Sequence, residues 1–207
     1  MPTLLPLILS YDEPAYLLTD GNGRLHPRQF GFACHMAVLL EERGFKEVKV
    51  IGVGKNLHIF EGLRLLNGEE VDVKKVKDMF KVFKEWWMKG GEVDGEEIVV
   101  LDHLNYEGYK LPENVPEKIK KLPAAVLYLY MESEQPVAAA FLKAGGESVN
   151  PIYVSVGNRI DLTEAIQVVE HCSTVRVPEP IRLADKGGRV RVRDMSAGDK
   201  GENTNDK

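Results

Sequence analysis

Residues Asp20–Lys55, DGNGRLHPRQFGFACHMAVLLEERGFKEVKVIGVGK, decide the fold of this chain. The stretch opens with an acidic residue at the end of the apolar run AYLLTD, which predicts the tip of a strand. Apolar residues then recur at helical spacing over 28–43, and the predicted helix stops at Gly44, a residue suited to the left-handed position after a helix. A second predicted strand covers 47–53 and leads to the final lysine. The acidic residue, His26 and that lysine therefore lie at the ends of elements or in the turns after them, where α/β folds place chemistry.

The remaining sequence predicts enough strands and helices for one α/β domain with a mixed sheet. The buried face of the first helix is expected to consist of Phe30, Ala33, Cys34, Ala37 and Val38. Further strands are predicted at 4–11, 15–19, 97–101 and 152–156, with a hairpin formed by 124–131 and 136–143. Further helices are predicted at 73–89 and after Asp161, whose spacing to Glu164 is that of a capping box. Over 186–207 the chain loses its apolar content, and we expect a disordered tail.

Composition is that of a globular protein without a membrane span. The chain has 207 residues, of which 43% are hydrophobic and 29% charged, enough for one well-buried domain. Its net charge of −5 argues against a broadly basic surface but is compatible with a local basic groove. Cys34 and Cys172 lie on apolar helix faces and are expected to be free thiols, which indicates a cytoplasmic location, with the nucleus as the alternative. No apolar stretch is long enough to cross a bilayer, so no membrane contact is expected.

The predicted helix at 73–89 has a lysine-rich face opposite its apolar stripe. The apolar stripe is regular and is expected to face the core, its tryptophans included. The lysines have two interpretations, a phosphate-contacting face or an ordinary solvated one, and the second is the more economical. They are Lys74, Lys75, Lys77, Lys81 and Lys84.

Two acidic residues stand at predicted strand ends. Glu13 and Asp20 are separated by an apolar run, and hard cations such as Mg²⁺ bind one or two carboxylates together with water and substrate phosphates. The pair therefore suits metal-assisted phosphodiester cleavage, although such spacing is also ordinary for turn residues. Lys55 is not part of a phosphate-binding loop, because Lys49 stands where that pattern needs glycine. It can still neutralise a phosphate as a point charge, and His26 is either a phosphate contact or a loop histidine.

Four motifs give the chain a resemblance to a known family. They are DGNG-x-LHPR-x-FG, IGV-x-K, NPIYVSVG-x-R and RVPEP-x-R-x-AD, in that order. The chain resembles the endonuclease V family of inosine-directed nucleases over about 13–63 and 136–185, and DGNG and ACH are similar to its eukaryotic branch. The resemblance implies an RNase H-like fold, with a mixed central sheet flanked by helices and without part of the family's N-terminal strand meander. Residues 1–185 would then form a single domain, with a divergent insertion at 64–123.

The resemblance also implies a reaction. It is hydrolysis of a phosphodiester one nucleotide 3′ of inosine, in RNA or DNA, by a monomeric enzyme that uses Mg²⁺ or Mn²⁺. Asp20 and Glu13 match the family's metal-binding carboxylates, His26 the histidine near the scissile phosphate, and Lys55 the lysine that contacts that phosphate. We expect these four residues to be catalytic, and the inosine base to leave the stack before it is recognised. Substrate contacts are expected from Leu9, Gly21, Asn22, Gly23, His26, Arg28, Lys55 and Asn158.

The sequence also departs from the family pattern. The family's first catalytic aspartate would precede Met1, so we expect one metal ligand to be missing. Leu4 replaces the wedge tyrosine, Leu7 replaces the glycine that makes room for the base, and Asn158 replaces the histidine of a late motif. These changes leave an alternative open: a catalytically impaired relative that binds nucleic acid or a partner without cutting.

Overall fold

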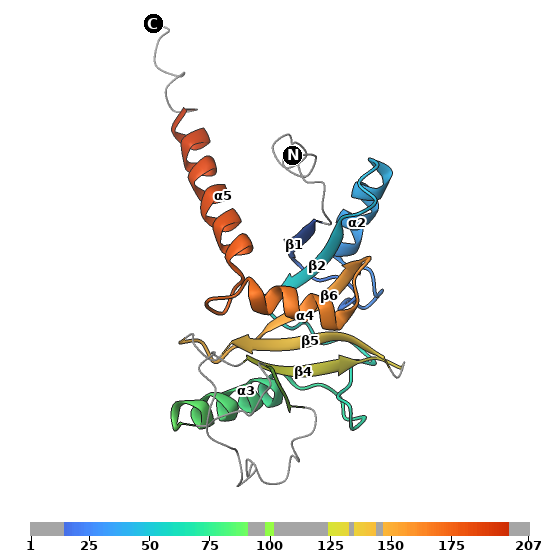
Figure 1. Cartoon of the computed structure of the whole chain (residues 1–207), viewed down its shortest axis with the longest axis vertical. Helices are drawn as coiled ribbons and strands as arrows, with labels where there is room; N and C mark the ends of the chain where they lie inside the picture. The colour runs from blue at the N-terminus through green and yellow to red at the C-terminus, as the bar shows by residue number, and fades with distance from the viewer. Residues whose placement is uncertain (1–14, 91–97, 102–123, 133–134, 144–146, 199–207) are drawn as a thin grey trace, which may run out of the picture.

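A six-stranded mixed sheet forms the centre of the computed structural model (Figure 1). Residues 15–90, 98–101, 124–132, 135–143 and 147–198 are described. The strands are β1 Tyr16–Asp20, β2 Lys49–Gly54, β3 Ile98–Val100, β4 Ala124–Tyr130, β5 Pro136–Lys143 and β6 Ile152–Asn158. They lie in the order β1-β2-β6-β5-β4-β3, which confirms the predicted mixed sheet.

Strand pairing brings the ends of β1 and β2 together. These two strands are parallel and Asp20 pairs with Val53, so β1 ends beside the last residues of β2, just before Lys55. Strand β6 runs antiparallel to β2, with Gly54 opposite Tyr153. Strands β4 and β5 are antiparallel, which confirms the predicted hairpin.

Two helices cover one face of the sheet and a third covers the other. Alternate strand residues point to opposite faces, and Val50 packs with α2 while Ile51 packs with α4. Tyr153 belongs to the cluster beneath α3 and lies opposite Gly54, on the same face as Val50, so α2 and α3 share a face. The helices are α2 Phe32–Glu42, α3 Val73–Met88, α4 Leu162–His171 and α5 Glu179–Gly198.

Helix α2 begins later than the sequence predicts. Its start is fixed by the preceding loop, because Ala33 N donates to Asn22 O at 3.0 Å. The expectation that Phe30 and Val38 are buried is therefore wrong, since they are 42% and 44% exposed. The buried face consists of Ala33, Cys34, Ala37 and Leu40. The helix ends as predicted, with Gly44 at φ +89°.

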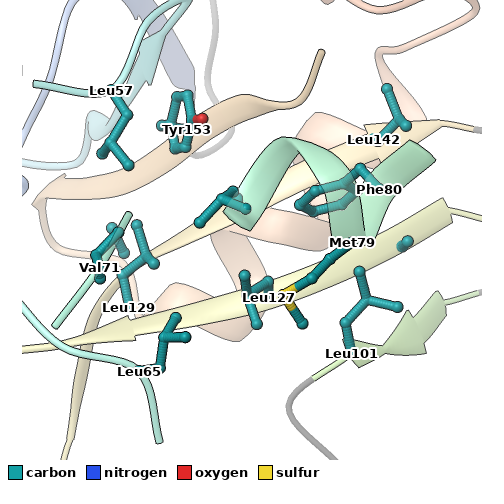
Figure 2. Packing of buried hydrophobic residues seen from close by; sticks show 14 of the residues in the cluster. Leu57, Leu65, Val71, Met79, Phe80, Leu101, Leu127, Leu129, Leu142 and Tyr153 are labelled. Carbon is teal, nitrogen blue, oxygen red and sulfur yellow. The ribbon is translucent and has the colours of Figure 1, made fainter. Parts of the chain in front are cut away.

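The core beneath α3 confirms the predicted apolar stripe and corrects part of the lysine face. Met79 and Phe80 pack against strand residues such as Leu127 and Leu142 (Figure 2). Lys84, expected on a solvated face, is buried instead, and its ammonium donates to Ser148 O at 2.9 Å. A buried ammonium is costly unless it is hydrogen-bonded, and the Ser148 carbonyl supplies that bond.

Helix α5 corrects the predicted tail. Residues 186–198 are helical where disorder is expected from 186, whereas 199–207 lie outside the described residues. The low apolar content that suggested disorder reflects exposure, because the helix projects from the sheet and its residues from Arg182 to Val192 are largely exposed (Figure 1). Neither α5 nor any other described helix combines the length and apolar content needed to cross a membrane. Cys34 and Cys172 are both free thiols, as predicted.

Candidate active site

The DGNG loop lies flat across one face of the sheet. Gly23 N donates to the Ser155 hydroxyl oxygen at 2.8 Å, and Arg24 N donates to Val156 O at 2.9 Å. A Cβ on Gly52 would lie 2.3 Å from Gly23 N, and a Cβ on Gly23 would lie 2.1 Å from Val156 O. Backbone therefore packs directly on backbone here, which fixes where β1 delivers its last residue.

The end of this unit holds three charged side chains, Asp20, Lys55 and Asp185, which we call the Lys55 cluster. The Lys55 ammonium donates to Asp20 Oδ2 at 2.8 Å and to Asp185 Oδ2 at 2.7 Å. Asp20 ends β1, Lys55 follows β2, and Asp185 lies in the second turn of α5. Two carboxylates thus converge on one cationic group, and their side chains are 45% and 38% exposed.

Mutual stabilisation of the charges shifts their titration. Hydrogen bonds to Asp185 and then to Asp20 raise the pKa of Lys55 above its usual value. The same ammonium, first through its hydrogen bond and then through its charge, lowers the pKa of Asp185. Lys55 and Asp185 therefore both carry full charge at neutral pH.

Arg176 fixes the backbone beneath the Lys55 cluster. Its Nη2 donates to Lys55 O at 2.6 Å and to Pro151 O at 3.2 Å, and its Nε donates to Asn150 O at 2.8 Å. Partial burial lowers the pKa of this guanidinium from its usual high value, and the three carbonyl acceptors supply the polar contacts that a partly buried cation needs. The end of β2 is therefore tied to the start of β6 and to the segment before α5.

A groove opens beside the Lys55 cluster. It has a volume of about 560 Å³ and is lined in part by Lys55, Asp185, Arg176, Arg182 and Ser148. Its charged lining consists of three cationic side chains, Lys55, Arg176 and Arg182, and two acidic ones, Asp185 and Glu147. The cationic groups are in the majority, which suits an anionic ligand such as a phosphate.

The other expected site residues are distributed more widely. His26 is half-buried and its Nδ1 accepts from Arg28 N at 3.2 Å, while the Arg28 side chain is exposed. Within the described residues His26 has no hydrogen bond to the Lys55 cluster. Asn158 pairs with Val50, so it lies toward the opposite end of β2 from Lys55, roughly 16 Å away along the strand.

Two expected site residues, Leu9 and Glu13, lie outside the described residues. The glycines Gly21 and Gly23 form the loop already described, and Asn22 lies between them. The Asn22 Oδ1 atom is buried and has no hydrogen-bond partner within the part of the chain that the structure describes. A buried, unpaired amide oxygen of this kind costs about 1–3 kcal/mol, and the packing of the loop holds it in place despite that cost.

The donor set suits a hard divalent cation in part. Asp20 and Asp185 offer carboxylate oxygens that are open to water, and Mg²⁺ binds one or two carboxylates while keeping several water ligands. The Lys55 ammonium lies at the point where these oxygens converge, so a cation there has to displace it or use the remaining carboxylate oxygens. Among the described residues no group of three or more acidic, histidine or cysteine side chains is arranged to hold a metal.

Two residues of the site, Asp185 and Arg176, were not predicted from the sequence. Both belong to the motif RVPEP-x-R-x-AD, which contributed to the resemblance without any role being assigned to its residues. The signal that could have found them is the motif itself, which places both residues after the last predicted strand. Asp185 is 130 residues from Lys55 and Arg176 is 121 residues from it, so only the fold brings them together.

Comparison with known proteins identifies the family. The family model described as Endonuclease V matches residues 1–93 and 107–186. Endonuclease V of Mus musculus is 29% identical over 199 residues, which cover 93% of this chain and 44% of the mouse protein. The catalytic domain of human Endonuclease V has 25% identity and a TM-score of 0.57, with 95% of this chain and 61% of that chain covered.

A third relative was solved with nucleic acid. Endonuclease V of Ciona intestinalis, in complex with a 24-mer DNA containing an inosine followed by a ribo-adenosine, has 26% identity and a TM-score of 0.58. The match covers 92% of this chain and 61% of that one. The chain spans about half the length of the curated relatives it matches. These likenesses confirm the RNase H-like fold, and the match to the family model over most of its length shows that this chain belongs to the endonuclease V family.

Proposed function

We propose that this chain is a metal-dependent endonuclease that hydrolyses a phosphodiester one nucleotide 3′ of inosine in a nucleic-acid strand. The observation that carries the proposal is the Lys55 cluster, in which two carboxylates and an ammonium meet at the ends of β1 and β2 beside an open groove. Membership of the family supplies the substrate class, and the Ciona intestinalis complex contains DNA with an inosine followed by a ribo-adenosine.

The described residues provide two of the functions that such hydrolysis needs. Asp20 and Asp185 would hold Mg²⁺ or Mn²⁺ through carboxylate oxygens, with Glu13 as a further expected ligand. When bound, such a cation activates water and stabilises the leaving oxygen. Lys55 is charged at neutral pH and would donate to a phosphate oxygen in the groove, where its positive charge offsets the charge that develops during cleavage.

The remaining residues would place the strand. Arg176 holds the backbone of Lys55, so we assign it a positioning role. Gly21, Asn22 and Gly23 would present the loop surface to the flipped base, and Leu9 is a further expected substrate contact. His26 and Arg28 would contact the strand further along the same loop. Asn158 ends β6, opposite Val50 near the start of β2, and would contact the strand at a distance from the cleaved bond.

A cleavage assay tests the proposal. Single-stranded RNA and DNA, each with one inosine, are incubated with the protein in Mg²⁺ and separately in Mn²⁺, with adenosine strands for comparison. We expect a nick one nucleotide 3′ of inosine, reduced about 10²–10³-fold by Asp20→Asn or Asp185→Asn, since each removes a preorganised charge. Asp78→Asn, which neutralises an exposed carboxylate on α3, serves as the matched control and should cut normally.

Binding of Mn²⁺, followed by calorimetry, provides a readout that does not depend on turnover. Asp20→Asn and Asp185→Asn should each weaken it, and Asp78→Asn should leave it unchanged. Cleavage that persists in both site variants, or that ignores inosine, would contradict the proposal.

The alternative is an impaired relative that binds inosine-containing strands without cutting. It is favoured by one observation, that no group of three or more potential ligands in the described part of the chain is arranged to hold a metal. Inosine-dependent binding in a gel-shift assay without any nick, in either metal, would establish this alternative.

A further inference from the structure

Helix α5 carries basic side chains that play no part in the Lys55 cluster. Arg182, Lys186 and Arg189 recur at i, i+4 and i+7, so they lie on one face of the helix, and we call them the basic row. All three are exposed. The row spans about 10 Å at the usual helical rise.

The basic row begins at the candidate active site. Arg182 lines the groove together with Lys55 and Asp185. Asp185, on the adjoining part of α5, binds the Lys55 ammonium at 2.7 Å. The positive charge of Arg189 also acts on Asp185 and contributes to lowering its pKa. Because Arg182 belongs both to the groove and to the basic row, a ligand that fills the groove also contacts the start of the row.

The charges of the row are largely available to a partner. From Glu179 to Val192, α5 has four basic residues against two acidic ones, although the whole chain carries −5. Both acidic side chains already bind cations, Glu179 with Arg182 and Asp185 with Lys55. Lys186 and Arg189 form no ion pair or hydrogen bond with another residue that the structure describes. Local positive charge of this kind attracts polyanions even on an acidic protein.

The position of α5 leaves the row open. The helix projects away from the sheet, and its outer turns have no other helix or strand beside them in the view (Figure 1). Its first turns lie near β1, the strand that delivers Asp20. A long, linear ligand could thus contact the row and the groove at the same time.

We propose that the basic row binds the sugar–phosphate backbone of the nucleic-acid strand next to the bond that is cut. This inference rests on the proposed nucleic-acid substrate but does not need cleavage to occur. Lysine and arginine contacts to phosphates position a protein on a strand without reading its sequence. The row would therefore add affinity and fix the direction in which the strand leaves the groove, while recognition of inosine stays with the loop.

The same helix does not have the pattern of a membrane-binding one. A helix that lies on a bilayer buries one continuous apolar face. The exposed apolar residues of α5 are divided, with Leu183 and Val190 on one flank of the basic row and Val192 on the other. Charge without a matching apolar face favours a phosphate backbone over a lipid surface.

The lysines of α3 provide a matched control. Three of the five are engaged, since Lys75 pairs with Glu69, Lys81 with Glu85, and Lys84 donates to Ser148 O. Lys74 and Lys77 are exposed, and α3 lies at the end of the sheet farthest from α5 (Figure 1). Replacing these two lysines removes as much charge as replacing two members of the row.

The test is a salt titration of binding. Fluorescence anisotropy follows labelled single-stranded RNA and DNA without inosine, in Mg²⁺, over a range of NaCl concentrations. The proteins are the unsubstituted chain, Lys186→Gln/Arg189→Gln on α5 and Lys74→Gln/Lys77→Gln on α3. Each lost phosphate contact should reduce the slope of log K against log salt by about 0.7 for a single strand, so the α5 variant should lose about 1.4. The α3 variant should keep the slope of the unsubstituted chain.

The outcomes separate this inference from the proposed function. A reduced slope confined to the α5 variant supports the basic row, whether or not inosine strands are cut. An unchanged slope in the α5 variant, with inosine strands still cut by the unsubstituted chain, overturns the row and leaves the nuclease intact. An equal loss in both variants overturns it as non-specific charge. Binding to phosphatidylserine–phosphatidylcholine vesicles that depends on α5, without binding to either strand, overturns it in favour of a membrane surface.

Discussion

Lys55 is the residue on which the site converges, because it is the common partner of two carboxylates from distant parts of the chain. Its ammonium binds both Asp20 and Asp185, and its backbone carbonyl accepts from Arg176. The side chain therefore neutralises the carboxylates when no cation is present, and a phosphate would compete with those carboxylates for it. Removing that positive charge should affect the binding of metal and the rate of cleavage in opposite directions.

The first prediction concerns this opposition. Lys55→Met should bind Mn²⁺ more tightly than the unsubstituted chain, because the ammonium that competes for Asp20 and Asp185 is gone. Its cleavage rate should fall by about 10²–10³-fold, since the positive group facing the phosphate is lost. Calorimetry and single-turnover kinetics measure the two effects. Lys55→Arg, which keeps the charge, should show neither effect in full, and weaker Mn²⁺ binding by Lys55→Met would show that the lysine helps to hold the metal.

A second prediction concerns the glycine beneath the DGNG loop. Gly52→Ala should destabilise the fold by about 1–3 kcal/mol, the range for overpacking, because the new Cβ would lie 2.3 Å from the backbone of Gly23. The loop must then lift, so cleavage should fall as well. Urea unfolding gives the stability and the inosine assay gives the rate. Gly62→Ala, at a position with open space but φ +86°, separates backbone strain from this clash, and only the clash should move the loop.

Among the elements, α5 links the site to the surface. Its first turns carry Asp185 and Arg182, whereas the middle of the helix contains Gly187 and Gly188 in open space. Glycine in a helix interior disfavours the helix by about 0.8–1.0 kcal/mol relative to alanine. The outer part of α5 is therefore expected to open more readily than the part that holds Asp185.

A third prediction follows for this helix. Gly187→Ala/Gly188→Ala should stabilise the outer turns of α5 locally, because neither new Cβ meets another atom within 4 Å. Amide hydrogen exchange should slow over about 186–192, while α3 exchange stays unchanged. Unaltered exchange over those residues would mean that the glycines do not limit the stability of α5.

Local sequence patterns predicted the helices and strands better than they predicted which distant residues contact them. The apolar stripe of α3 and the β4–β5 hairpin follow from spacing within one segment, and both are present. Lys84 was expected in solvent because its acceptor, Ser148 O, is 64 residues away and invisible to helical periodicity. The helical part of the expected tail was missed for a different reason: low apolar content indicates exposure, and exposure does not exclude a helix.

At the scale of the whole molecule, charged side chains tie the helices to the sheet. Glu164, in the first turn of α4, accepts from Lys49 on β2 and from Tyr16 on β1. Asp185 on α5 accepts from Lys55, which follows β2, whereas Glu179 accepts from Arg182 within α5 itself. Hydrogen bonds to these cations are the main cause that lowers the pKa of all three carboxyls.

The fourth prediction is the resulting pH dependence. Each of these carboxyls has a lower pKa in the folded protein than in the unfolded chain, so its contribution to stability is complete above its ordinary value, 4.5 for glutamate and 3.8 for aspartate. That contribution is lost as pH falls below those values through the folded pKa. The free energy of unfolding should therefore decline from about pH 5 downward. Urea titrations at a series of pH values measure it. Glu164→Gln should flatten the decline, whereas Glu42→Gln, at an exposed position on α2, should not.

The sequence could predict two members of the Lys55 cluster and not the third. Asp20 and Lys55 stand at strand ends within one strand–helix–strand unit, so local order already places them near each other. Asp185 is the last residue of the predicted domain, 130 residues from Lys55, and only the packing of α5 near β1 brings it to Lys55. Sites assembled from distant segments are therefore recovered in part from local pattern, and completed by topology.

The separation of these segments has a consequence for the order of synthesis. A ribosome produces Asp20 and Lys55 early, while Arg176 and Asp185 are added near the end of the described chain. Until then the Lys55 carbonyl lacks the Arg176 guanidinium as its donor, and the Lys55 ammonium lacks Asp185 as its second acceptor. A nascent chain can thus form most of the sheet while its proposed cutting centre is still open.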